Sequence, residues 1–175
     1  IDAKEIQEFI NSKIEKKFQK VDPEKLEYVE KQKAFSAPVK SAEPFTPVSK
    51  EQSGYQNYAA WVLGESFNID ELLQAHLVSL LLLGNSASPL YKVLESNDIG
   101  KSPAQILGLE DSMRHLMFIC GIEGSDEKSQ DKFIKLIDST FKDIAKNGFS
   151  QDQIDAAFYQ LELSRREISS GSLPY

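Results

Sequence analysis

The stretch Leu81–Ser96, LLLGNSASPLYKVLES, constrains the fold more than any other part of the sequence. A leucine-rich helical run stops at Gly84-Asn85, and Ser88-Pro89 opens a second one, because serine is a common N-cap and proline suits the first helical position. We expect Gly84 to adopt the left-handed conformation that ends many helices. Two consecutive helices can then cover one face of a sheet. The stretch therefore predicts a structural corner formed by Gly84, Ser88, Pro89 and Leu90.

Hydrophobic periodicity predicts the elements around this corner. Residues 1–20 have the spacing of an amphipathic helix. Tyr55–Leu63 is apolar on both faces, which predicts a strand in a sheet that is covered on both sides. Asp70–Leu83 is apolar nearly all round, which predicts a deeply buried helix, and Asn68 can cap it. Two apolar runs separated by a polar turn predict a β-hairpin, with arms at Ala104–Leu109 and Met113–Ile122.

Two further amphipathic helices follow the hairpin. The first spans Asp126–Lys146 and ends at Asn147-Gly148. The second is opened by a capping box of Ser150 and Gln153 and extends to about Ile168, with its buried face formed by Ile154, Ala157, Phe158 and Leu161. The order β-α-α-β-β-α-α predicts an α+β fold, in which helices pack on one face of a mainly antiparallel sheet.

The domain organisation follows from the proline-rich polar region near the start. Residues 24–52 are polar and contain Pro38, Pro44 and Pro47, which predicts an extended connector with one short strand near Glu27–Lys33. We expect residues 1–52 to be a helix plus an inter-domain connector, and residues 53–175 to be an α+β domain truncated at its C-terminal end. The first residue is Ile1, and a helix-like segment leads into the last residues, so we expect a piece of a longer protein.

Composition limits the partners. The net charge is −7 and the lysines and arginines are scattered, so we expect no nucleic acid partner. Apolar runs are shorter than the roughly 18 residues of a membrane span, so we expect no membrane partner. The single cysteine, Cys120, lies in an apolar run, which favours a buried thiol over a catalytic one.

The residues taken alone show no active site. His76 and His115 lack a second ligand at zinc-site spacing, and neither H-E-x-x-H nor H-x-x-E-H occurs. Arg165-Arg166 could meet an anion, but a solvated helix face is favoured. No serine lies in G-x-S-x-G, which favours caps and turns for Ser86, Ser88, Ser170 and Ser172.

The corner nevertheless carries a resemblance. Leu81–Leu90, LLLGNSASPL, followed by YKVLE, resembles a hallmark of the presequence protease subfamily, which belongs to the pitrilysin/insulysin clan of zinc peptidases. Four other pieces are similar to this subfamily: WVLG at 61–64, ICGIEG at 119–124, LELSRRE at 161–167 and the GSLP segment at 171–174. The similarity spans residues 53–175.

The resemblance implies a non-catalytic role. Such enzymes have four homologous domains in two halves that close around a chamber, and the inverted zinc motif lies in the first domain. The Arg/Tyr pair of the last domain has no counterpart in Lys101–Asp111, so the chain is similar to the second domain. The resemblance thus implies no catalytic and no metal-binding residue here, and no cofactor of its own. It implies zinc in a missing domain of the parent protein.

The implied partners are the other domains of the same parent chain and, in the full-length protein, peptide substrates. The implied location is bacterial cytoplasm or an organelle matrix. We expect a scaffold domain that forms part of the chamber wall of a peptide-degrading zinc metallopeptidase. The alternative is a non-enzymatic peptide-binding or structural subunit on the same scaffold, and an unrelated α+β domain also stays open. An H-x-x-E-H motif upstream of Ile1 would favour the enzyme.

Overall fold

A computed structural model describes residues 2–18, 22, 33, 35–46 and 54–166. The chain divides into two compact units, Ile1–Pro44 and Phe45–Tyr175, which are described separately. In the described residues, no helix has the length and apolar character needed to cross a membrane.

The first unit contains helix α1 (Ala3–Lys13), followed by the short 3-10 helix η1 (Glu15–Lys17). The carboxylate of Asp2 caps α1 by accepting the Lys4 N–H at 2.9 Å. The helix expected over residues 1–20 therefore exists but is shorter, because the chain tightens into the 3-10 turn after Ile14. Its apolar side is exposed within this unit, at Ile6, Phe9, Ile10, Ile14 and Phe18. All of the strand expected near Glu27–Lys33 except Lys33 lies outside the described residues.

The second unit is built on an antiparallel sheet with β4 at its centre. The strands are β1 (Tyr55–Glu65), β2 (Ser102–Pro103), β3 (Gly108–Glu110) and β4 (His115–Ser125). β1 pairs with one edge of β4, and the two short strands pair with the other edge. The expected hairpin is present as β3–β4, but its first arm is broken. β2 ends at Pro103, and pairing with β4 resumes as β3 at Gly108, which has a φ of 99°.

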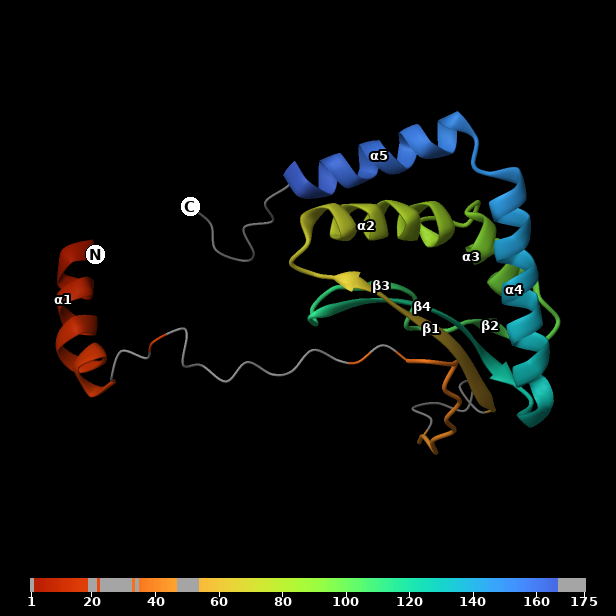
Figure 1. The fold of residues 1–175 in the computed structure, drawn as a ribbon, viewed down its shortest axis with the longest axis horizontal. Helices are drawn as coiled ribbons and strands as arrows, with labels where there is room; N and C mark the ends of the chain where they lie inside the picture. The colour runs from red at the N-terminus through yellow and green to blue at the C-terminus, as the bar shows by residue number, and fades with distance from the viewer. Residues whose placement is uncertain (1, 19–21, 23–32, 34, 47–53, 167–175) are drawn as a thin grey trace. The chain divides into compact units, whose positions relative to one another are not determined.

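The helices of this unit are α2 (Ile69–Leu83), α3 (Pro89–Ser96), the short 3-10 helix η4 (Glu127–Ser129), α4 (Gln130–Asn147) and α5 (Gln151–Arg166). Helices α2, α3 and α4 lie on one face of the sheet, and α5 lies over α2 (Figure 1). The α+β fold class with helices on one face is confirmed. The element order differs from the expected one by the additional short strand β2.

Local capping chemistry sets the helix starts. The Asn68 side chain accepts the N–H groups of Asp70 and Glu71, at 3.2 and 3.5 Å, where α2 begins. Before α5, Gln153 Oε1 accepts the Ser150 N–H at 2.9 Å, and Ser150 Oγ accepts the Gln153 N–H at 3.3 Å. This reciprocal pair is the predicted capping box.

The hydrophobic core lies between the sheet and helices α2, α3 and α4. Its buried residues come from α2, α3, β4 and α4: Leu82, Leu90, Leu94, Phe118, Cys120, Ile122, Phe133 and Ile137. Trp61 of β1 packs against this cluster, with its ring centroid 5.3 Å from that of Phe141.

Three burial predictions were wrong. β1 is not covered on both faces, because helices cover only one face of the sheet and Val62 on the other is 46% exposed. Helix α2 is not deeply buried: Leu82 is its only buried residue, and Val78 is 48% exposed. Phe158, which we placed on the buried face of α5, is 54% exposed.

Candidate functional site

The predicted corner joins α2 to α3. The Gly84 N–H donates to the Leu80 carbonyl oxygen at 2.8 Å and ends α2. Its φ and ψ of −65° and −20° are right-handed, so the expected left-handed conformation was wrong. The absence of a side chain matters for another reason, because a Cβ at this position would collide with the Leu80 carbonyl oxygen. Gly84 permits a close approach of the backbone to the preceding turn.

Hydrogen bonds within the loop hold the corner. Asn85 Oδ1 accepts the Ala87 N–H at 2.9 Å, and the buried Ser88 Oγ accepts the Asn85 N–H at 3.2 Å. Ser88 occupies the N-cap position of α3, but its hydroxyl bonds back into the loop instead of capping the helix. Pro89 is the first residue of α3 and the Leu90 side chain is fully buried. The described geometry is that of a packed structural turn.

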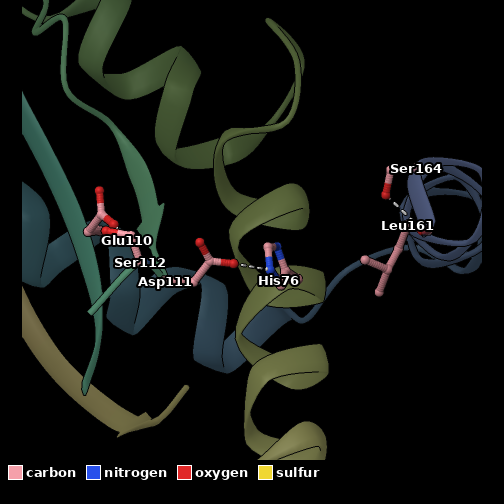
Figure 2. A network of polar contacts seen from close by, with 6 residues as sticks. All are labelled: His76, Glu110, Asp111, Ser112, Leu161 and Ser164. Carbon is pink, nitrogen blue, oxygen red and sulfur yellow. Dashed lines mark hydrogen bonds and ion pairs between the residues drawn. The ribbon is translucent and has the colours of Figure 1, made fainter. Parts of the chain in front are cut away.

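A polar contact links α2 to the β3–β4 hairpin (Figure 2). His76 Nε2 on α2 lies 2.9 Å from Asp111 Oδ2, and both side chains are partly exposed. In the hairpin turn, Glu110 Oε1 accepts the Ser112 N–H at 2.9 Å, and the hydrogen bonds from Ser112 lower the Glu110 pKa. Sequence reasoning missed the His76–Asp111 pair because the partners are 35 positions apart.

These carboxylates do not complete a metal centre. In the part of the chain that the structure describes, no three His, Cys, Asp or Glu side chains form a group that could hold a metal ion. His115, the second histidine, lies on β4 opposite Glu65 of β1 and is partly buried.

The candidate nucleophiles lie at separate places in the chain. Cys120 is buried in β4, and burial raises the pKa of its thiol to about 12, so the thiol stays protonated at neutral pH. Ser86 is exposed in the corner, and Ser170 and Ser172 lie outside the described residues. On α5, the exposed Arg166 pairs with Glu162 at 2.5 Å, as expected for a solvated helix face.

An apolar groove is a second feature that sequence reasoning missed. It has a volume of about 540 Å³ and runs between α2 and α4, with β1 along its floor. Glu71 and Gln74 are its polar lining residues; the others are Trp61, Leu63, Gly64, Ala75, Val78, Leu82, Phe118, Phe141, Ile144, Ala145 and Phe149. The Glu71 carboxylate already accepts the Glu65 N–H at 2.7 Å. The signal in the sequence was the excess of apolar residues on β1 and α2.

Comparison with known proteins finds one matching family and several relatives. Residues 1–161 match the family described as "Peptidase M16 inactive domain". The chain is 31% identical over 147 residues to "Presequence protease 1, chloroplastic/mitochondrial" of Arabidopsis thaliana, covering 82% of this chain and 13% of that protein. It is 28% identical over 123 residues to "Presequence protease, mitochondrial" of Aspergillus fumigatus, covering 70% and 12%.

A bacterial relative aligns over more of the chain. "Protein HypA" of Clostridium perfringens is 25% identical over 171 residues, which is 95% of this chain and 17% of that protein. The chain thus spans between 12% and 17% of the length of these three relatives.

Proposed function

Because the chain belongs to the M16 peptidase family, as an inactive domain of the presequence protease-like type, we propose that it forms part of the wall of a peptide-degrading chamber. The catalytic zinc would be held by another domain of the longer parent protein. The observation that carries the proposal is the match of residues 1–161 to the inactive domain.

The sheet supplies a surface suited to such a wall. Trp61 packs toward the helices, so its neighbours Ala60 and Val62 point to the opposite face, because side chains alternate along a strand. On this open face Tyr58 is 40% exposed and Val62 is 46% exposed. We propose that the open face of the sheet contacts peptide substrates. The corner Gly84, Ser88, Pro89 and Leu90 would act from the other side, by fixing α2 and α3 to the back of the sheet.

The proposal that another domain holds the catalytic zinc can be tested by metal analysis and peptide cleavage. The 175-residue chain alone should neither retain zinc after dialysis nor cleave unfolded peptides, whereas the longer parent should do both. Stoichiometric zinc in the isolated chain would contradict the proposal. A parent that neither binds zinc nor cleaves peptides would instead support the non-enzymatic subunit.

The wall itself can be tested by photo-crosslinking. A photoreactive amino acid at Val62 of the parent protein should capture a trapped, uncleavable peptide. The matched control is Phe158 on the outer side of α5, which has a similar exposure and should capture little. Equal capture at both positions would show that the open face of the sheet has no special access to peptides.

A further inference from the structure

The side chain of Glu123 lies on the open face of the sheet. Its neighbour Ile122 on β4 is fully buried in the core, and side chains alternate along a strand, so Glu123 points to the opposite face. Ser102 of β2 pairs with Glu123, and the Ser102 hydroxyl donates to Glu123 Oε1 at 3.1 Å. The other oxygen, Oε2, is buried and receives no hydrogen bond. Within the described part of the chain it is the one buried side-chain polar atom without a partner.

This carboxylate oxygen is suited to a donor from outside the chain. Taking a charged oxygen out of water without giving it a hydrogen bond is costly, so folded proteins rarely leave one unpaired. Lys101 lies near, but its side chain runs along Gly124 and donates no hydrogen bond to Oε2. The last torsion of a glutamate side chain is broad, and Glu123 is partly exposed, so its carboxylate can turn Oε2 toward the surface of the open face. A donor bound there would supply the missing hydrogen bond.

The ring of Tyr58 lies beside this carboxylate. Tyr58 of β1 pairs with Gly121 of β4, and its ring covers that glycine, because a Cβ added to Gly121 would lie 2.6 Å from Tyr58 Cδ1. Gly121 and Glu123 are two positions apart on β4 and share the open face. Partial burial and, to a smaller extent, the negative charge of Glu123 raise the pKa of the Tyr58 phenol, so the carboxylate is close enough to act on it. A carboxylate next to an aromatic face attracts a positive charge.

We infer that Glu123 and Tyr58 form a subsite for a basic side chain, lysine or arginine, of a bound peptide. The inference rests on the proposed function, because it takes the open face of the sheet to be the surface that peptides contact. The ammonium or guanidinium group donates to Glu123 Oε2, and the side chain packs against the Tyr58 ring. The net charge of −7 favours the approach of basic peptides. Glu123 is then a residue that selects peptides by their charge.

A divalent metal ion fits the subsite less well. Calcium takes several oxygen ligands from the protein, whereas Glu123 offers one free oxygen. The described residues bring no three metal-ligating side chains together at this or any other place. A basic side chain needs only one carboxylate, and its apolar stem can lie along the Tyr58 ring while its charged end reaches Glu123. The chemistry of the two residues therefore favours lysine or arginine.

Paired peptides test the inference in the longer parent protein. The probes are an uncleavable unfolded peptide with a single arginine and the same peptide with citrulline, the uncharged isostere of arginine, at that position. Glu123→Gln should raise the dissociation constant of the arginine peptide about tenfold, because a charge-assisted hydrogen bond is lost, and that of the citrulline peptide less than about twofold. The matched control is Glu162→Gln on α5, which removes the same charge from an exposed helix position and should change neither constant by more than about twofold.

Substitutions of Tyr58 give a second readout. Tyr58→Leu should weaken binding of the arginine peptide about threefold, and Tyr58→Phe, which keeps the ring, should retain it. Equal losses for the two peptides in Glu123→Gln would overturn the inference, and so would a loss of the same size in Glu162→Gln. Peptide capture at Val62 tests the proposed function separately. Capture at Val62 together with equal binding of the two peptides would overturn the subsite alone, whereas no capture there would overturn both proposals.

Discussion

Replacing Leu90 with alanine should measure how strongly the corner is anchored. Leu90 begins the apolar stripe of α3, is fully buried and belongs to the core between the helices and β4. The substitution removes about three methylene equivalents, and at about 0.8 kcal/mol each the lost transfer free energy is about 2.4 kcal/mol. The cavity left in the core brings the total destabilisation to about 3–4 kcal/mol.

Urea unfolding followed by the fluorescence of Trp61, the sole tryptophan, is a suitable assay because this ring packs beside Phe118 and Phe141. With a slope of about 2 kcal/mol per molar urea, the midpoint should fall by about 1.5–2 M with an unchanged slope. The matched control is Leu163→Ala on α5, where the side chain is 43% exposed and the loss should stay below about 1 kcal/mol. A Leu90→Ala loss no greater than that of the control would refute the reasoning.

Three further substitutions test separate features of the second unit. The raised pKa of Cys120, about 12 against an ordinary 9.0, means that the folded state binds this proton more tightly than the unfolded chain. The free energy of unfolding contributed by this shift is complete below about pH 9 and is lost as the pH rises toward 12. Between these pH values Cys120→Ala should therefore lose less free energy of unfolding than the unsubstituted chain. An equal loss in the two proteins would contradict the raised pKa of Cys120. Gly121→Ala should cost about 1–3 kcal/mol in urea unfolding, because the new Cβ would lie 2.6 Å from Cδ1 of Tyr58 and 2.7 Å from the Asn57 carbonyl oxygen, and a neutral result would mean that both the ring and the paired strand move aside freely. Asn68→Ala removes the cap of α2 and should cost about 1 kcal/mol by thermal unfolding, whereas Asn68→Asp should retain most of the stability.

Features encoded by neighbouring residues were predictable from the sequence. The capping box of Ser150 and Gln153 and the cap at Asn68 form as expected, because their partners lie within three positions. The start of α3 at Pro89 also depends on local backbone chemistry. The conformation of Gly84 was missed, because glycine permits both left- and right-handed geometry and the close approach to Leu80 is visible only in three dimensions.

Features encoded by distant residues were not predictable. Nothing in the spacing of His76 and Asp111 indicates that a hairpin turn brings them within 2.9 Å of each other. Likewise, the groove is lined by residues of β1, α2 and α4 that are far apart in the sequence, and both helices contact β1. Periodicity identifies the apolar side of each helix but not the distance to the next element.

The wrong burial predictions have a common physical cause. The apolar residues of a segment mark every surface that the segment buries in the functional protein. Those surfaces include ones that are covered by other parts of the protein. β1 and α2 both carry more apolar surface than this unit buries, and the excess on both elements includes the groove, at Leu63 and Val78. Leu63 and Val78 line the groove, whereas Val62 lies on the opposite face of the sheet, so the excess occupies two faces of this unit.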